Sequence, residues 1–479
     1  MKMMLILFSL LCVTTVAAQA AEVTATVDAR QRRQTIEGFG TCLISWGKTA
    51  QSDFYDDELA QIYAEELGLN MLRVNVAPWG YPKTEDPDAI TWEKIDLNDK
   101  SNSRVPVFIE FGKKLKKYNP ELRVIGTVWS PPAWMKMNNN ITGGRPWKRE
   151  TREPGIQGST YKKRKRATRN RVDPKYYPHF CELMAAMCKL HEQHGVPFYA
   201  LSPGNEVMFS QTFESCTWIG EDFATIIAML GEPLEREGYG DVLLYGPETM
   251  TQHNWSIANP IYIKELRQNE KAWKHFDRFA THGYVDGFEA DMSAESSLQY
   301  WNMIKAYDKP YWMTEGGTGG HGWPEALNGV AAAIHNSLVA GNCSAWVPWQ
   351  IASGNGQENG HALMAGHRLT KKTQAVKHFT RWIDAGAVRL HVAAPPEPLR
   401  LSAYYHDENR QLTVVAINPT AEAQSLSLAL NGLPVDAFKT YRTSAGEDHA
   451  AAAPVQVGNG RATLSLPPES ITTLVGQGR

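Results

Sequence analysis

The sequence predicts an α/β fold, a (β/α)8 TIM barrel followed by a C-terminal β-sandwich that an N-terminal strand completes. From about residue 35 to 385, short apolar runs alternate with longer amphipathic runs. This alternation is typical of parallel strands that are each followed by a covering helix. After Pro395 and Pro396 the pattern changes to short alternating runs separated by turn residues, which is typical of a small antiparallel domain.

Eight apolar runs of strand length support the barrel. They span 35–43, 70–76, 122–129, 197–203, 241–247, 278–284, 310–315 and 343–351. Helix patterns lie between them at 56–68, 106–118, 180–195 and 325–341, and several stop at glycine, as helices tend to do. A doubly wound open sheet is the competing architecture. It would need a GxGxxG loop after its first strand, and IEGFGTC at 36–42 does not match that pattern.

The remaining sequence sets the expected domain limits. Residues 1–21 contain a lysine, an apolar run and then small residues, which predicts a signal peptide cleaved after Ala18, Ala20 or Ala21. The bulky Leu11 disfavours lipid attachment at Cys12. We therefore expect a secreted or periplasmic protein. The strand at 22–34 should join the sandwich at 389–479, and 35–388 should form the catalytic barrel.

Composition excludes several classes of protein. The 479 residues carry a net charge of −2, so the whole chain has no strong attraction to nucleic acid or anionic membranes. No later run is apolar for the length that a membrane span requires. The five cysteines after Cys12 are an odd number spread over a large chain, which predicts buried thiols. No metal-binding motif is present, so we expect no metal site. We also expect no cofactor and a monomer.

The ends of the predicted strands carry polar and aromatic residues. In a (β/α)8 barrel the active groups lie at the C-terminal ends of the strands, so these residues should face one another. The candidates are Arg73, Trp79, Trp129, Asn205, Glu206, His282, Tyr284, Glu315 and Trp349.

Two glutamates at such strand ends are the minimal equipment for cleaving a glycosidic bond. One carboxyl group must be protonated to assist the leaving oxygen, and the other must be ionised to attack the anomeric carbon. We assign Glu206 as the acid/base and Glu315 as the nucleophile. Asn205 would then bind the sugar 2-hydroxyl, and Tyr284 or Arg73 would keep Glu315 ionised.

The chain resembles glycoside hydrolase family 30 over nearly its whole mature length. The matching stretches are IEGFG (36–40), LRVNV (72–76), VWSPPAWMK (128–136), SPGNEV (202–207), THGY (281–284), MTEGG (313–317), RWIDAGAVRL (381–390) and PPESITTLVG (467–476). Members are retaining β-glycosidases, and the resemblance implies the same roles for Glu206 and Glu315. The family's strand-two arginine, strand-three tryptophan, strand-six tyrosine and strand-eight tryptophan correspond to Arg73, Trp129, Tyr284 and Trp349. Many members have Asn-Glu-Pro, where this chain has Val207.

The sugar is less well defined than the chemistry. The segments GFGTCLISW and VWSPPAWMKMN look nearest to the endo-β-1,6-galactanase-like branch of the family. The alternatives are a hydrolase of an acidic glycan such as glucuronoxylan and a non-catalytic carbohydrate-binding relative. The presence of both glutamates disfavours the latter. The loop at 314–325 offers His321 and Trp323 as further sugar contacts, or serves only as a connection.

A basic segment follows the third strand. Residues 145–171 hold 11 lysines and arginines against two glutamates. Like-charge blocks of this kind are usually solvated insertions. The alternative is that the segment attracts an acidic polysaccharide, because arginine suits carboxylate and sulfate geometry. A nucleic-acid or polyanion binder is a third class of function, and only this basic segment suggests it.

Overall fold

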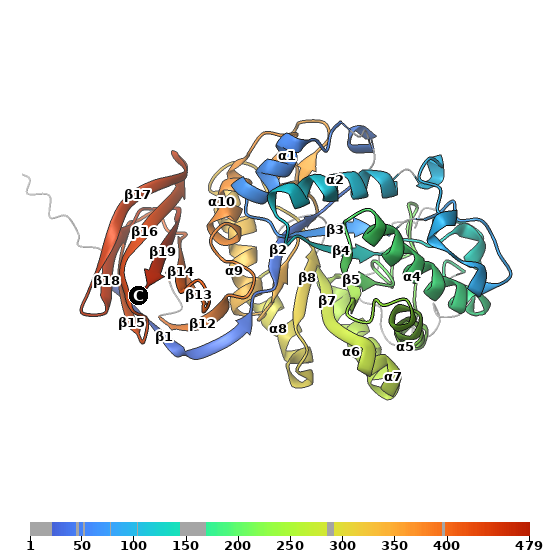
Figure 1. The fold of residues 1–479 in the computed structure, drawn as a ribbon. Helices are drawn as coiled ribbons and strands as arrows, with labels where there is room; N and C mark the ends of the chain where they lie inside the picture. The colour runs from blue at the N-terminus through green and yellow to red at the C-terminus, as the bar shows by residue number, and fades with distance from the viewer. Residues whose placement is uncertain are drawn as a thin grey trace, which may run out of the picture.

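The structure is a computed structural model that describes residues 22–44, 47–50, 53–76, 78–102, 104–143, 169–284, 292–394 and 398–479. Two β-rich units lie side by side (Figure 1). One is a barrel surrounded by helices, and the other is built from the C-terminal strands. The expected signal peptide lies outside the described residues, as do residues 145–168 of the basic segment.

Eight parallel strands close into a barrel in chain order. They are β2 (Gly38–Cys42), β3 (Met71–Asn75), β4 (Arg123–Thr127), β5 (Phe198–Ser202), β6 (Leu243–Thr251), β7 (Phe276–Tyr284), β8 (Tyr311–Glu315) and β9 (Ala345–Trp346). All neighbouring pairs are parallel, including β2 with β9, which closes the ring. The predicted barrel is confirmed, although β9 is shorter than the run at 343–351.

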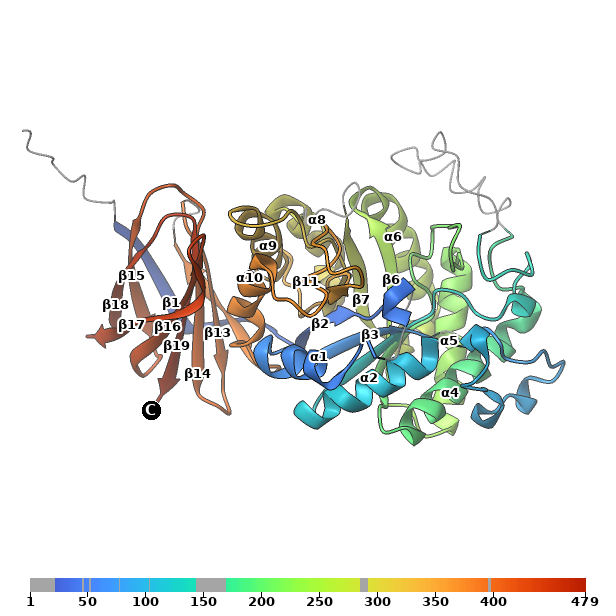
Figure 2. The ribbon, with the colours of Figure 1, turned by 90° about the horizontal axis from the view of Figure 1, so that it is seen from above.

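Helices surround the barrel and bury the outer faces of its strands (Figures 1 and 2). They are α1 (Asp57–Gln61), α2 (Arg104–Tyr118), α4 (Tyr177–Gln193), α5 (Gly220–Arg236), α6 (Gln252–Gln268), α7 (Glu270–His275), α8 (Ala294–Ile304), α9 (Ala332–Val339) and α10 (Lys371–Thr380). The side chain of Asp56 caps α1 by accepting a hydrogen bond from the Leu59 amide. A π-helical turn at Ile62–Glu66 extends α1, and a second one at Leu327–Ala331 precedes α9.

Alternation along a strand decides which residues reach the barrel interior. In β3, Leu72 and Val74 belong to the core between strands and helices. Because successive side chains point to opposite faces, Arg73 is directed into the barrel. It is fully buried there, and it lies over the ring of Trp129. A charged residue in a mostly apolar strand therefore reaches the inside of the barrel.

The C-terminal unit is a second, all-β domain. Its strands are β1 (Glu22–Thr35), β12 (Val388–Ala393), β13 (Arg400–His406), β14 (Gln411–Asn418), β15 (Gln424–Asn431), β16 (Val435–Ser444), β17 (Glu447–Gly458), β18 (Arg461–Leu466) and β19 (Ser470–Gly478). They form one closed sheet in the order β1-β12-β13-β14-β19-β16-β17-β18-β15. The expectation of a second all-β domain is confirmed, and where we expected a sandwich the strands form this single closed sheet.

The N-terminal segment enters the second domain before the chain builds the barrel. Strand β1 pairs in parallel with β15 and antiparallel with β12. Figure 2 shows β1, in blue, lying among the red C-terminal strands. Its buried residues Val23, Ala25 and Val27 belong to the core of that domain. The alternating pattern of the segment is thus explained by one buried and one solvated face.

Helix α10 connects the barrel to the second domain. His378 on this helix contacts two threonine hydroxyls of the closed sheet, Thr473 through Nδ1 and Thr443 through Nε2, each at 2.8 Å. Just after the helix, Trp382 stacks on Tyr441 with ring centres 4.4 Å apart. Polar pairing and aromatic packing therefore hold the two domains together.

Two further expectations concern the cysteines and membrane-spanning helices. Cys42, Cys181, Cys188, Cys216 and Cys343 are buried free thiols, as predicted. In the part of the chain that the structure describes, no helix is long and apolar enough to cross a membrane.

Candidate active site

The ends of β3, β7 and β8 place three of the predicted residues in contact. Arg73 Nη1 lies 2.9 Å from Glu315 Oε2, and the Tyr284 hydroxyl donates to Glu315 Oε1 at 3.1 Å. All three side chains are almost completely buried. Glu315 ends β8, so its carboxylate lies at the C-terminal mouth of the barrel, and each of its two oxygens accepts a hydrogen bond.

Arg73 is the centre of a larger network. Its guanidinium has five N–H donors, and each has an acceptor. These acceptors are Glu315 Oε2 at 2.9 Å, Asn205 Oδ1 at 2.7 Å, a Glu248 carboxylate oxygen at 3.0 Å, Thr127 Oγ1 at 3.2 Å and the Cys42 sulfur at 3.1 Å. A rigid planar cation with this many fixed partners positions every group that it contacts.

Asn205 and Glu206 follow β5 in a turn that directs their side chains to the barrel mouth. Glu206 has a positive φ of 46°, an uncommon backbone conformation for a residue other than glycine. Its amide donates to the Glu248 carbonyl at 3.1 Å, and its carbonyl accepts from the Phe209 amide at 2.7 Å. The pair is fixed by backbone bonds on both sides, so the strained conformation is maintained by the surrounding structure.

His282 lies between the carboxyl groups. Its Nδ1 is 3.2 Å from Glu206 Oε1, and its Nε2 is 3.5 Å from Glu315 Oε2 and 3.8 Å from a Glu248 oxygen. Burial by itself lowers the pKa of His282. The charge of Glu315 and the carboxyl groups of Glu206 and Glu248 outweigh that effect and raise the pKa to about 9. The imidazole is therefore protonated at neutral pH, and both ring nitrogens are donors.

Glu206 has the electrostatic surroundings of a proton donor. Burial raises its pKa, because the site disfavours the charged form, and the nearby charge of Glu315 raises it further. The hydrogen bond from His282 and the charge of Arg73 act in the opposite direction without reversing the shift. One carboxyl oxygen of Glu206 and one of Glu315 lie within 4.8 Å of each other.

A third buried glutamate was missed by the sequence analysis. Glu248 follows Gly246 and Pro247 in β6 and is inaccessible to solvent. Burial raises its pKa, but Arg73, His282 and a hydrogen bond from Thr314 outweigh burial and lower the pKa to about 2. The signal in the sequence is an apolar run that ends in a glutamate, and it resembles the runs that end in Glu206 and Glu315.

Three predicted tryptophans lie close to one another along the chain segments that follow β3, β4 and β9. Trp129 and Trp349 have ring centres 6.1 Å apart, and Arg73 lies over the Trp129 ring. Trp79 is attached beside Trp129, since its indole nitrogen donates to the Ser130 carbonyl at 2.8 Å, and Arg104 covers its ring. The structure therefore places Trp129 against the Arg73 network, and the role of Trp79 in substrate binding stays a prediction.

The loop after β8 attaches Trp323 to the second domain. Its indole nitrogen donates to the Glu469 carbonyl at 2.7 Å, and the side chain packs against the main core while remaining partly exposed. A role of Trp323 in sugar binding stays a prediction. His321 is exposed and lies 3.6 Å from Glu358.

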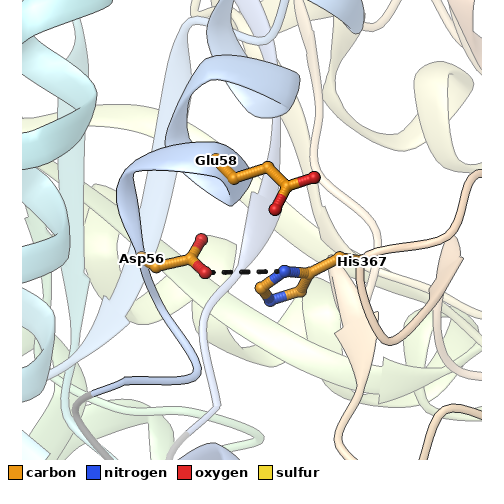
Figure 3. Close-up of side chains that lie close together, drawn as sticks. All are labelled: Asp56, Glu58 and His367. Carbon is orange, nitrogen blue, oxygen red and sulfur yellow. Dashed lines mark ion pairs between the residues drawn. The ribbon is translucent and has the colours of Figure 1, made fainter.

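Among the residues that the structure describes, two groups of side chains have the composition of a metal site, whereas the sequence predicts none. Glu206, His282 and Glu315 form the first. The cations Arg73 and protonated His282 occupy the positions around these carboxylates, which makes the group a poor site for a metal ion. Asp56, Glu58 and His367 form the second, near the start of α1 (Figure 3). There Asp56 caps the helix and His367 Nε2 contacts the Phe54 carbonyl at 2.8 Å, so both already have protein partners.

No model of a known protein family matches this sequence. The chain is 24% identical over 493 residues to glucuronoxylanase XynC of Bacillus subtilis, and the match covers 98% of this chain and 97% of the relative. A glycoside hydrolase family 30 subfamily 8 xylanase from Clostridium acetobutylicum has a TM-score of 0.73 at 23% identity, covering 95% of this chain and 100% of that chain. The catalytic domain of a family 30 xylanase C from Talaromyces cellulolyticus has a TM-score of 0.72 at 19% identity, covering 95% and 100%.

The two solved structures share the fold of this chain. The expected galactanase-like branch is not confirmed, since these relatives are a glucuronoxylanase and xylanases. The relatives and the shared fold together support the prediction that this chain is a glycoside hydrolase related to family 30.

Proposed function

We propose that this protein is a retaining β-glycoside hydrolase in which Glu206 is the acid/base and Glu315 the nucleophile. The observation that carries the proposal is the short separation between the two carboxyl groups: one carboxylate oxygen of Glu206 and one of Glu315 lie within 4.8 Å of each other. Retaining enzymes have carboxyl groups about 5–5.5 Å apart, whereas inverting enzymes need about 6.5–9.5 Å to admit a water molecule. The close pair therefore favours direct attack on the sugar.

Glu315 is equipped to act as a nucleophile. Its two oxygens accept from Tyr284 and Arg73, and both donors favour the ionised carboxylate. His282, at 3.5 Å, adds a further positive charge. Attack by this carboxylate on the anomeric carbon would form a covalent glycosyl-enzyme intermediate.

Glu206 would donate its proton to the leaving oxygen in the first step. Its raised pKa keeps it protonated for that role. Once the leaving group departs, the ionised Glu206 removes a proton from water, and the resulting hydroxide equivalent cleaves the intermediate. The sugar is released with its original β configuration because two inversions occur at the same carbon.

The neighbouring residues would bind the sugar. Asn205 Oδ1 accepts from Arg73, which leaves the amide NH2 to donate to a sugar hydroxyl. Trp129 and Trp349 offer aromatic faces, which suit the apolar faces of sugar rings.

We place the catalytic barrel at residues 35–388 and the second domain at 22–34 with 389–479. We also propose that the protein is exported, because of the signal-peptide pattern.

For the substrate we propose glucuronoxylan. The relative that covers nearly the whole chain is named for this activity. The basic segment at 145–171 is consistent with a substrate that carries carboxylates. A neutral β-1,6-galactan is the second candidate, because of the resemblance of the segments at 38–46 and 128–138 to the galactanase-like branch.

One assay distinguishes these substrates. Release of reducing ends is measured with glucuronoxylan, unsubstituted xylan and β-1,6-galactan, with Glu315→Gln as the inactive control. The proposal predicts turnover of glucuronoxylan above the other two. The first product, observed by NMR during the reaction, should be the β anomer. Initial release of the α anomer contradicts the retaining mechanism, and turnover of galactan alone contradicts the proposed substrate.

A further inference from the structure

Glu248 has no role in the mechanism above, although it is the most deeply buried carboxylate of the site. Its side chain is inaccessible to solvent, and it accepts hydrogen bonds from Arg73 at 3.0 Å, Thr127 at 3.1 Å and Thr314 at 2.7 Å. His282 Nε2 lies 3.8 Å from one of its oxygens. A buried charge with this many partners is held in one orientation and remains ionised.

The groups that face Glu248 from the surrounding strands define the charge of the site. They are Cys42 on β2, Arg73 on β3, Thr127 on β4, Tyr245 on β6, His282 on β7, and Thr314 and Glu315 on β8. Burial raises the pKa of Cys42 to about 12 and the pKa of Tyr245 well above its ordinary value, so both are neutral. The positive charges near Glu248 are then those of Arg73 and His282, and the negative charges are those of the carboxylates.

Charge balance assigns a role to the third carboxylate. Two cations, Arg73 and His282, lie among three carboxyl groups. A buried site disfavours net charge, so one of the three carboxyl groups keeps a proton. Glu248 and Glu315 both accept directly from Arg73, whereas the carboxyl group of Glu206 lies against His282. The proton therefore belongs to Glu206.

We propose that Glu248 is a positioning residue whose fixed negative charge balances Arg73 and His282 and thereby lets Glu206 hold the proton needed for general acid catalysis. This inference rests on the proposed glycosidase function, in which Glu206 is the acid. Without the charge of Glu248, two cations face only Glu206 and Glu315, and both of these carboxyl groups ionise. Glu206 then loses its proton at a lower pH, and the acid form of the enzyme is depleted.

The test replaces the carboxylate by an amide of the same shape, Glu248→Gln. In protein labelled with 13C at the glutamate carboxyls, the Glu206 resonance is identified by its absence in Glu206→Gln. The titration midpoint of Glu206 should fall by about 1 pH unit in Glu248→Gln, the lower end of the range that a neighbouring charge produces, because His282 lies between the two carboxyl groups. The alkaline limb of kcat/KM on glucuronoxylan should move to lower pH by a similar amount. An unchanged Glu206 midpoint overturns the proposal.

Matched measurements distinguish the effect of the Glu248 charge from a structural effect of the substitution and from a failure of the proposed function. Thr314→Val removes one hydrogen bond to Glu248 and keeps its charge, so the midpoint of Glu206 should stay in place. If Glu248→Gln does not fold, the wild-type titration decides, because a Glu206 midpoint at or below the ordinary value for glutamate overturns the proposal. If the wild-type protein cleaves no β-glycan, the proposed function fails. The NMR titration still tests the charge balance.

Discussion

The Tyr284 hydroxyl donates a hydrogen bond of 3.1 Å to one oxygen of Glu315, while the other oxygen of that carboxylate is bound by Arg73. The carboxylate is thus held in one plane by two donors from different strands, β7 and β3. A fixed orientation of this kind is what a carboxylate needs in order to act as the proposed nucleophile.

Removing the Tyr284 hydroxyl should alter the acidic limb of the pH profile. Tyr284→Phe keeps the ring and removes a donor that favours the charged form of Glu315. The acidic limb of kcat/KM should therefore move to higher pH, and activity at low pH should fall most. The pH–rate profile on glucuronoxylan measures this. A variant with an unchanged acidic limb removes Tyr284 from the role of supporting the nucleophile.

The two glutamates should respond differently to the same substitution. Glu315→Gln should abolish turnover of every substrate because no nucleophile remains. Glu206→Gln should reduce hydrolysis of natural glycans by about 10²–10⁴-fold, the usual contribution of a general acid. Aryl glycosides with activated leaving groups need no proton, so their cleavage should be far less affected. Steady-state kinetics with both substrate types measure the difference, and equal losses contradict the acid assignment of Glu206.

His378 should make the folded protein sensitive to acid. Burial lowers its pKa well below the ordinary value, and the charges of His449 and Lys377 lower it further. The unfolded chain binds a proton near pH 6.5, whereas the folded chain does not, so the free energy of unfolding falls as pH drops below about 6.5. Burial also lowers the pKa of His449, to about 4, which adds to the same trend.

The variant His378→Gln tests this acid sensitivity, since an amide can bond both threonine hydroxyls but cannot take up a proton. Its Tm should fall less steeply between about pH 6.5 and 5 than that of the wild type, because one proton fewer is bound on unfolding. His321→Gln is the matched control, because this side chain is 55% exposed in the folded protein. Equal slopes for the His378 variant and the wild type contradict the prediction.

The basic segment should make the affinity for an acidic polymer depend on salt. Attraction between the segment and a glucuronoxylan weakens with ionic strength, so KM for that polymer should rise with salt. KM for a neutral oligosaccharide should stay constant. Serine replacements at residues 162–166 should remove the dependence and leave kcat on short substrates intact. If KM for the acidic polymer responds to neither salt nor these replacements, the segment has no part in substrate binding.

Much of the barrel could be predicted because its strands are buried on both faces. A buried parallel strand is a continuous apolar run, and such a run is visible in consecutive residues. Glu206 and Glu315 could be selected as candidates for the same reason, since each interrupts such a run at its end. Strand β17 is different, because most of its residues are exposed or half-buried and carry no apolar pattern.

Contacts between distant segments were decided by the tertiary structure. The sequence determined the barrel strands, the second all-β domain and the two glutamates, because each is encoded by residues that are neighbours in the chain. The partners of Glu248 and the attachment of Trp323 to Glu469 depend on how the barrel closes and how the domains dock. Those arrangements form only when apolar surfaces far apart in the sequence are buried together, and no local pattern specifies which polar groups then meet.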